Sequence, residues 1–374
     1  MTESVNTLDV ETDIKHINML CKLLGLAPYK IIKNKFSGDD IIIDCNIRNN
    51  VILTIWSVVS ATIMLVSIVV TIIHYTNQLS QSLSNNINAL LCVPMFPTVA
   101  FVAILMNLTI NKHKMAEFIS KISYIDTKLN KLNRSIPAEK HYRFLRDVDI
   151  VIVLLVLLPF CESECWIWRT DDSLNLQYRS VMYSNIMDVA VMLQFCKCVT
   201  IIRKRLFELS LSVKQMYNPS SGTYELRCLL GEICKATSII NSMYGPLILL
   251  ELIKMFLVLI NFNLMIIYFN ISISKAISLI AWKMLMMVEI IYIVVNCQLT
   301  VNKLRHLNQS VLINLCLKQR LKTEVFQQLT LFFNQISTCG LEFTACGLIK
   351  LDFSFLCSVL TSIVTFAIIL LDFK

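Results

Sequence analysis

The sequence is short of glycine, proline and charge. Of its 374 residues, seven are Gly, seven are Pro and 16% are charged, whereas 56% are hydrophobic. A soluble protein of this length carries about a quarter charged residues. The deficit excludes an ordinary soluble globular protein and favours a membrane protein with several spans.

The sequence patterns of soluble enzymes are also missing. There is no glycine-rich phosphate loop, no HExxH motif and no zinc-like pair of cysteines, and the five His residues are scattered. We therefore expect no catalytic residue, no metal and no cofactor. The net charge of +8 does not indicate a nucleic-acid partner, because the basic residues fall in short blocks between long apolar runs, as in membrane proteins.

A cleavable signal peptide is missing as well. The first thirty residues lack a basic start, an apolar middle and a small-residue cleavage site in that order, so we expect an internal span to direct insertion. Most of the 14 Cys residues lie in apolar or basic segments, where Cys acts as a small apolar residue. Cys161 and Cys165 are expected outside the cell, where they could be bridged or free.

Seven stretches have the length and apolar character of membrane-spanning helices, which need about twenty residues. They cover residues 51–73, 87–110, 148–168, 181–202, 247–268, 276–301 and 353–373. Several contain charged residues. Glu251 and Lys254 in the fifth span are three positions apart, so they share a helix face and are predicted to form an ion pair.

The distribution of Lys and Arg predicts the orientation. Of the 34 basic residues, 26 lie in the N-terminal segment and in every second connection, while four lie in the alternate connections and at the C-terminus. Basic segments remain in the cytosol. We therefore expect a cytosolic N-terminus and an extracellular C-terminus, with short outer loops and long inner ones. Asn270 is the one outward glycosylation pattern, and it lies close to the membrane.

The inner segments are predicted to form helices of their own. In residues 115–129 the apolar positions recur at helical spacing, at Met115, Phe118, Ile119, Ile122 and Leu129. Residues 301–338 contain no Gly or Pro, so the sixth helix is expected to continue into the cytosol, and residues 341–349 are expected to form a separate short helix. We predict an all-α membrane protein with four parts: a cytosolic segment (1–50), a ligand-binding bundle (51–301), cytosolic anchor helices (302–352) and a last span (353–374).

The C-terminal sequence TFAIILLDF resembles the TYhhhhhQF signature, where h is hydrophobic, that closes the last span of insect gustatory receptors. Thr365, the apolar run after Phe366, and Phe373 match, whereas Phe366 replaces Tyr and Asp372 replaces Gln. The N-terminal LCKLLGLAPY, residues 20–29, is similar to the Gly-Leu-x-Pro-Tyr stretch that precedes the family's first span. The length and the orientation agree with the same family, so the resemblance covers the whole chain.

The resemblance implies a ligand-gated cation channel. Members of the family are tetramers in which the last helix of each subunit lines a central pore, cytosolic helices form an anchor, and ligand binds in an outward-open pocket within each bundle. On this chain the pore and gate would involve Thr365, Phe366, Ile369, Asp372 and Phe373. Four Asp372 carboxylates would form a ring that favours cations and that protons could block. The alternative is an interfacial Asp that marks the end of a helix.

The ligand class is left open by the resemblance. Sugar-receptor members tend to have Glu directly after the Tyr of the signature, whereas this chain has Ala367. We therefore expect a bitter or other non-sugar tastant. Polar and aromatic residues in the outer halves of the spans are the candidates for ligand contact: Trp166, Trp168, Tyr183, Asp188, Asn261, Asn263, Trp282 and Lys283.

Each candidate has a structural alternative. Trp and Tyr residues also form interfacial belts, and at most one of Asn261 and Asn263 can face a cavity. Asp188 could bind a cationic alkaloid or pair with Lys283.

For the protein as a whole, the expected partners are a tastant, permeating cations, membrane lipids and further receptor subunits, alike or different. The expected location is the plasma membrane of sensory neurons. A seven-span receptor without its own pore, and an odorant-type channel subunit, are the alternatives.

Overall fold

The protein is helical along most of its described length. The computed structural model describes residues 10–33, 41–44, 50–78, 93–132, 172–215, 219–268, 273–317 and 323–372. In chain order the helices are α1 (Val10–Leu23), α2 (Val51–Gln78), α4 (Met95–Met106), the π-helical turn η2 (Asn107–Asn111), α5 (Lys112–Leu132), α7 (Asp172–Gln215), α8 (Pro219–Tyr268), α9 (Ile273–Leu317), α10 (Thr323–Thr338) and α11 (Phe353–Asp372). Two short antiparallel strand pairs accompany them: β1 (Lys30–Lys33) with β2 (Ile41–Asp44), and β3 (Thr344–Ala345) with β4 (Ile349–Lys350).

Five of the described helices are long and apolar enough to cross a membrane. The candidate spans are Val51–His74, Met95–Lys131, Val181–Val213, Tyr224–Ile260 and Met286–Val311. The second of them runs without a break through α4, η2 and α5. The shorter helix α11 is apolar over Phe353–Phe366. These segments overlap six of the seven expected spans, and the other expected span, residues 148–168, lies outside the described residues. The apolar helices thus agree with the prediction wherever the structure describes the chain.

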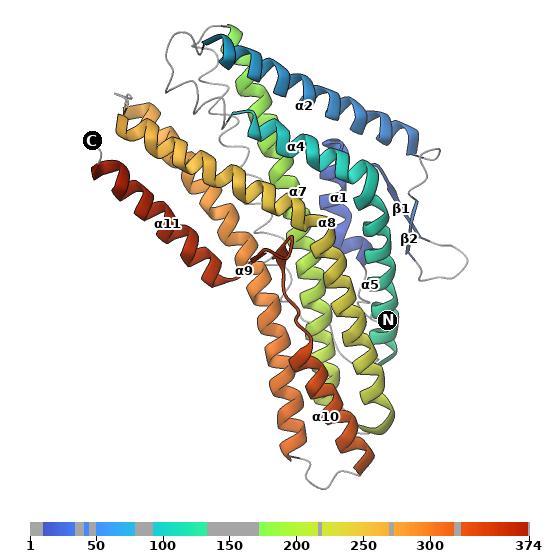
Figure 1. The fold of residues 1–374 in the computed structure, drawn as a ribbon. Coiled ribbons are helices and arrows are strands. Elements are labelled where there is room, and N and C mark those ends of the chain that lie inside the picture. Colours follow the sequence, from blue (N-terminus) through green and yellow to red (C-terminus); the bar gives the residue numbers. More distant parts are fainter. Residues whose placement is uncertain are drawn as a thin grey trace, which may run out of the picture.

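Three helices extend far beyond the length that a membrane requires. α8 has 50 residues, α9 has 45 and α7 has 44, so α8 alone measures about 75 Å, against about 30 Å of hydrocarbon. Figure 1 shows the lower parts of these helices running together to one end of the molecule, where α10 packs against α8 and α9. We call this the inner end, after the expected orientation, and the opposite end, where α11 finishes, the outer end.

Helix α10 is held at the inner end by an apolar stripe and by a reciprocal amide contact. Leu329, Phe332 and Ile336 recur every three to four residues and are at most 4% exposed. Arg227 on α8 donates from Nε to the side-chain oxygen of Gln335 at 3.3 Å, and Gln335 donates back to the Arg227 carbonyl at 3.1 Å. The inner ends of the helices are therefore packed together within one chain. A shared anchor between subunits stays a prediction.

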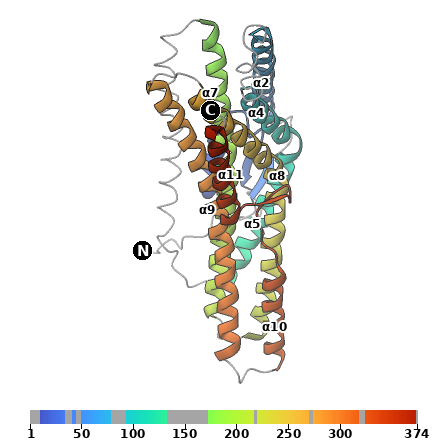
Figure 2. The ribbon, with the colours of Figure 1, turned by 60° about the vertical axis from the view of Figure 1, so that its left-hand side comes forward.

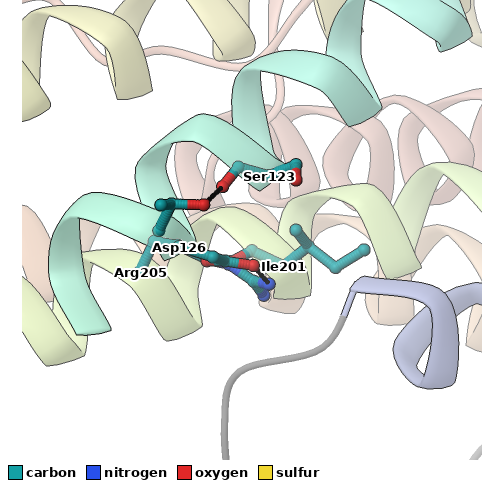
Figure 3. Close-up of polar contacts among 5 residues, drawn as sticks. Ser123, Asp126, Ile201 and Arg205 are labelled. Carbon is teal, nitrogen blue, oxygen red and sulfur yellow. Dashed lines mark hydrogen bonds and ion pairs between the residues drawn. The ribbon is translucent and has the colours of Figure 1, made fainter. Parts of the chain in front are cut away.

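The predicted apolar stripe in the inner segment after the second span is confirmed in α5. All five of its positions are at most 3% exposed: Met115, Phe118, Ile119, Ile122 and Leu129. The same face carries Asp126, whose carboxylate accepts hydrogen bonds from Nε and Nη2 of Arg205 on α7, at 2.8 and 2.6 Å (Figure 3). Arg205 is fully buried, so a two-point ion pair joins α5 to α7 inside the core.

The turn after α1 docks on the first span. Gly25 has a φ of +76°, and a Cβ added there would lie 2.8 Å from the Ser60 Oγ of α2. Both the left-handed backbone and the close approach therefore require glycine. On the other side of the turn, the indole of Trp56 donates a hydrogen bond to the Leu23 carbonyl at 2.8 Å. The Gly-Leu-x-Pro-Tyr-like stretch is thus a structural joint between the N-terminal helix and the membrane bundle.

The prediction of a short helix at residues 341–349 is wrong. This segment is the β3–β4 hairpin, in which Thr344 is paired with Lys350. Cys346 and Gly347 have φ values of 55° and 73°, in the left-handed region that a right-handed helix cannot use. Glu342 pairs with Lys350 at 2.8 Å across the hairpin. Gly347 is the one residue of the segment whose type favours such a turn.

The long helix expected after the sixth span is present in two pieces. α9 continues to Leu317, well past the apolar part of the span, and α10 follows from Thr323. Figure 1 shows α10 lying beside the inner part of α9, pointing back towards the outer end. The chain then reaches α11 through the β3–β4 hairpin, so this hairpin connects the inner helices to the last span.

Candidate functional site

Helix α11 packs against the rest of the chain along one side only. Its half-buried side chains recur every three to four residues: Phe355, Leu356, Val359, Ile363 and Phe366. This side lies against α8 and α9, and α11 follows the outer part of α9 in both views (Figures 1 and 2). The opposite side is open, with Val364 and Ile368 57% and 54% exposed. Within one chain, α11 is a peripheral helix with an uncovered face.

The uncovered face of α11 carries a row of hydroxyl groups. The row consists of five exposed residues, here called the hydroxyl stripe: Ser354, Ser358, Thr361, Ser362 and Thr365. At 100° per residue they lie within about 100° of the helix circumference. Ser358, Thr361 and Ser362 donate to the carbonyl four positions earlier, at 2.8 to 2.9 Å, so each hydroxyl oxygen can still accept a hydrogen bond. The stripe gives an otherwise apolar helix one polar side.

The residues predicted for the pore divide between the two sides of α11. Thr365 belongs to the hydroxyl stripe, and the helical period places Ile369, which is 45% exposed, and Asp372 on the same side. Phe366 is half-buried on the packed side. The side chain of Asp372 and the whole of Phe373 lie outside what the structure describes. The four Ser and Thr residues before Thr365 were missed by the sequence analysis, although their spacing is visible in the sequence.

The start of α11 is coupled to α8 through the β3–β4 hairpin. Asn241 on α8 donates to the Glu342 carbonyl at 2.7 Å and accepts from the Thr344 amide at 3.3 Å. One turn further along α8, a Cβ at Gly245 would lie 2.9 Å from the Cys346 backbone nitrogen. Asp352 then caps α11 by accepting from the Phe355 amide at 2.9 Å. A movement of α8 at this point would therefore move the hairpin that leads into α11.

A second polar region lies inside the bundle, between α7, α8 and α9. Lys254 on α8 is 2.6 Å from a carboxylate oxygen of Asp188 on α7 and 2.6 Å from one of Glu251 on its own helix. All three residues are at most 2% exposed. The Lys254 ammonium also faces the ring of Phe96 on α4 at 5.2 Å, and Glu289 on α9 is close enough to interact electrostatically with the group. We call Asp188, Glu251, Lys254 and Glu289 the acid centre.

The ion pairs of the acid centre can be compared with what the sequence suggested for the charged residues in the spans. The predicted pair between Glu251 and Lys254 is confirmed. For Asp188, ligand contact and pairing with Lys283 are the open alternatives; the structure shows it paired with Lys254, and the side chain of Lys283 is not described. Spacing along the chain gives no information about which helices are neighbours, so it could not predict the partner of Asp188.

The remaining pocket candidates are described only in part. Tyr183 is half-buried on α7, five residues before Asp188. Asn261 and Asn263 lie towards the end of α8, and Trp282 and Lys283 lie near the start of α9, but only the helices are placed there and the side chains are not described. The remaining two candidates, Trp166 and Trp168, lie outside the described residues. Ligand contact by this set therefore stays a prediction.

The cysteines show one feature that the sequence analysis did not predict. Cys234 on α8 is joined by a disulfide to Cys339, which follows the last residue of α10. Both lie at the junction of the inner helices with the β3–β4 hairpin. The predicted candidates for a bridge, Cys161 and Cys165, lie outside the described residues.

These features define a class of protein before any relative is considered. The described chain has five helices that could each cross a membrane and a shorter apolar helix at its C-terminus. Two buried ion pairs, Arg205–Asp126 and Lys254–Asp188, join neighbouring helices, and apolar side chains of α2 such as Ile52 and Val66 are exposed, as lipid contact would require. The protein is a multi-pass helical membrane protein.

Comparison with known proteins identifies the family. The sequence matches the 7tm chemosensory receptor family over residues 15–374, nearly the whole chain. The chain therefore belongs to the 7tm chemosensory receptor family. No curated protein matches the sequence.

Solved structures show the same fold. The chain is similar to the insect olfactory receptor OR5 from Machilis hrabei in complex with eugenol, with a TM-score of 0.71 and 13% identity, over 97% of this chain and 98% of that chain. A second structure of OR5 from Machilis hrabei gives a TM-score of 0.73 and 13% identity over 98% and 99% of the two chains. At this identity the likeness shows the fold alone.

Proposed function

We propose that this chain is a gustatory-type subunit of a ligand-gated, non-selective cation channel in the plasma membrane of sensory neurons. Helix α11 lines a pore on the axis of four subunits, either identical or mixed with other gustatory receptors. A small-molecule tastant binds within the outer half of the bundle and opens the pore. The packed inner helices hold the subunits together.

The hydroxyl stripe on α11 is the observation that carries this proposal. α2 and α11 are both exposed on the single chain, but the exposed face of α2 is dominated by large apolar side chains, as expected of a surface that faces lipid. The exposed face of α11 also has apolar side chains such as Val364 and Ile368, but five hydroxyl residues lie together on it, and the helical period places Asp372 in line with them. Such a face is suited to water and ions, which a pore shared between copies would supply.

The outer position of Asp372 supports selection for cations. The helical period places Asp372 in line with the hydroxyl stripe, one turn after Ile369. Four copies around an axis would form a ring of carboxylates at the outer mouth, and rings of this kind attract cations. Phe373 would follow at the constriction. A neutral side chain at the same position would act on ions through its dipole alone.

The ligand is proposed to be a small non-sugar tastant. OR5, which has a similar fold, has been solved in complex with eugenol, a small organic molecule, which supports a small organic ligand for this chain. Ala367 stands where sugar-receptor members tend to have Glu. A cationic alkaloid at the carboxylate of Asp188 is one of the two alternatives for this residue, but that carboxylate is buried and engaged by Lys254. We therefore do not extend the proposal to a particular chemical class of tastant.

Expression of this chain alone tests the proposal. Currents would be recorded from whole cells over a panel of sugars, amines and plant toxins, and then from excised patches in nucleotide-free solution. An agonist-evoked cation current that persists in the excised patch is the expected result. A response that needs nucleotide and disappears on excision would instead identify a receptor without its own pore.

A second candidate function is an odorant-type channel subunit. The two solved structures described above are both of an olfactory receptor, which favours this alternative. The C-terminal TFAIILLDF, with its resemblance to the gustatory signature, favours the first candidate. Responses to volatile ligands, obtained only when an odorant co-subunit is expressed with this chain, would decide for the odorant type.

A further inference from the structure

The acid centre contains more acidic groups than basic ones. Three carboxylates, those of Asp188, Glu251 and Glu289, face a single ammonium, that of Lys254. They come from α7, α8 and α9, so the group joins three helices of the bundle. With every carboxylate ionised, the centre would carry two uncompensated negative charges in an apolar part of the protein.

Hydrogen bonds from the described side chains do not compensate this excess of negative charge. Lys254 contacts one oxygen of Asp188 and one of Glu251. The other oxygen of each, together with Oε1 of Glu289, is buried and has no hydrogen-bond partner among the described side chains. A buried carboxylate oxygen without a donor costs a large part of its hydration free energy. The centre therefore has three acceptor atoms that lack a proton donor.

The side chains that the structure describes around the centre do not supply a second cation. From α4 the neighbour is the uncharged ring of Phe96, and from α7 the thiol of Cys196 faces Glu289. Arg203 interacts electrostatically with the Cys196 thiol and has further interactions of its own. Lys283 precedes Glu289 by six positions, which places it about 9 Å along α9 and about 120° around it, on another face.

A metal ion is not indicated as the missing cation. Among the residues that the structure describes, no group of three or more His, Cys, Asp or Glu is arranged to hold a metal. A proton needs no cavity and no coordination geometry. Bound to one carboxylate, it removes a charge from the centre and turns one acceptor oxygen into a donor.

We propose that the acid centre is a proton-binding site, in which the carboxylates of Asp188, Glu251 and Glu289 together hold at least one proton near neutral pH. Release of the proton in alkaline solution leaves uncompensated charge between α7, α8 and α9 and weakens their packing. The opposite change, uptake, tightens the three helices around Lys254.

The centre lies beside the surface that supports α11. Met255 follows Lys254 on α8, and Ile290 follows Glu289 on α9; both belong to one apolar cluster, on which Phe355 and Leu356 of α11 pack. Loss of the proton would loosen the helices that carry this cluster. If the proposed channel function holds, proton occupancy therefore also shifts the agonist concentration needed for opening.

The first test measures folding and needs no current. The full-length protein in lipid nanodiscs is unfolded with denaturant between pH 6 and 9, as wild type, Glu289→Gln and Glu232→Gln. Isolated carboxyl groups are ionised over this range, so a proton held only in the folded state makes stability fall as pH rises. The unfolding constant should then rise by up to about tenfold per pH unit for each proton.

Glu289→Gln removes the proposed proton carrier and keeps the shape of the side chain. We expect the unfolding constant of this variant to depend on pH much less than that of the wild-type protein. Glu232→Gln is the matched control, because it neutralises a Glu on the same bundle that pairs with Lys121 and Lys235 at the inner end. Equal pH slopes in wild type and in Glu289→Gln would overturn the proposal.

The second test keeps the proposal falsifiable if Glu289→Gln does not fold. Infrared spectra of the wild-type protein and of Asp372→Asn are recorded at pH 7 and pH 9 in H₂O and D₂O. We expect the carbonyl band of a protonated carboxylic acid at pH 7, in both proteins, and its loss at pH 9. The absence of such a band at pH 7 would overturn the proton site, whatever the currents show, whereas failure of the channel proposal would leave the band in place.

Discussion

Helices α7 and α11 satisfy their polar groups in opposite ways. In the most apolar window of α7, 83% of the residues are buried within the chain, and its charged side chains Asp188 and Arg205 form ion pairs with α8 and α5. α11 directs its hydroxyl stripe away from the chain and packs only its apolar side. The comparison indicates that α7 is an internal support of the chain, whereas the uncovered face of α11 requires surroundings that the described part of a single chain does not supply.

The largest expected effect comes from breaking an internal ion pair of α7. Arg205→Met removes the guanidinium and leaves the Asp126 carboxylate, 7% exposed, in the core without its cation. Loss of one partner of a buried pair costs about 3–5 kcal/mol. We expect a loss of that size in the free energy of unfolding, measured in detergent or nanodiscs, with much less protein at the cell surface.

A double variant separates charge from packing at this site. Arg205→Met combined with Asp126→Leu replaces the pair by apolar side chains, so part of the lost stability should return. A single variant as stable as wild type would show that Arg205 is not buried against Asp126 as the structure has it.

The second effect concerns the contact that joins α8 to the last span. Gly245→Ala places a methyl group 2.9 Å from the Cys346 nitrogen and 3.3 Å from the Thr344 carbonyl oxygen, both backbone atoms. Overpacking of this kind costs about 1–3 kcal/mol. We expect the hairpin to shift and agonist-evoked current to fall, measured as the maximal current per receptor at the cell surface.

Gly231→Ala is the control for this substitution. It lies on the same helix, and the nearest atom to its added Cβ is the Gln335 side chain at an ordinary 3.7 Å. Alanine at such a helical position should leave the current unchanged and stabilise the helix by up to about 1 kcal/mol. Equal currents from the two variants would argue against coupling through Gly245.

The sequence predicted the spans well because composition and helical period are local properties. The apolar stripe of α5 and the pair between Glu251 and Lys254 follow from spacing within one helix, and the structure shows both. Neighbours between helices could not be predicted in this way. The partner of Asp188 depends on which helices touch, and the turn at Cys346 depends on left-handed backbone angles that apolar residues do not reveal.

The third effect is a difference in chemical access along α11. In a Cys357→Ser background, Ser362→Cys places a thiol on the hydroxyl stripe and Ile363→Cys places one on the side packed against α8 and α9. If the stripe faces a water-filled pore, a charged, membrane-impermeant thiol reagent should modify the first much faster than the second, and faster still with agonist. Modification is followed as the rate of loss of current.

The outcome of this cysteine comparison bears directly on the comparison between α7 and α11. Similar, slow modification at both positions would mean that the stripe faces lipid or protein. In that case α11 would be a support like α7, and the pore would have to lie elsewhere.

The fourth effect is a change in ion conduction at the outer end. Asp372→Asn keeps the size of the side chain and removes the proposed ring of charge, so single-channel conductance should fall or cation preference should shift. Mildly acid solution should reduce the wild-type current by neutralising the ring and should have less effect on the variant. Unchanged permeability together with unchanged acid sensitivity would make Asp372 an interfacial residue that marks the helix end.

The smallest expected effect contrasts the buried pair of Arg205 with an exposed one at the inner end. Glu232 is 3.2 Å from Lys121 and 2.7 Å from Lys235. The hydrogen bond from Lys235 and that from Lys121 hold the pKa of Glu232 below its usual value of 4.5. Its contribution to stability is therefore complete above that value and is lost as the pH falls through the lowered pKa.

Glu232→Gln should cost less than about 1 kcal/mol at pH 7, because solvent screens the pair. The difference in the free energy of unfolding between wild type and variant, measured with denaturant, should shrink further in high salt and in acid. A loss of stability as large as that of Arg205→Met would mean that the inner helices rely on surface charge rather than on their packed apolar faces.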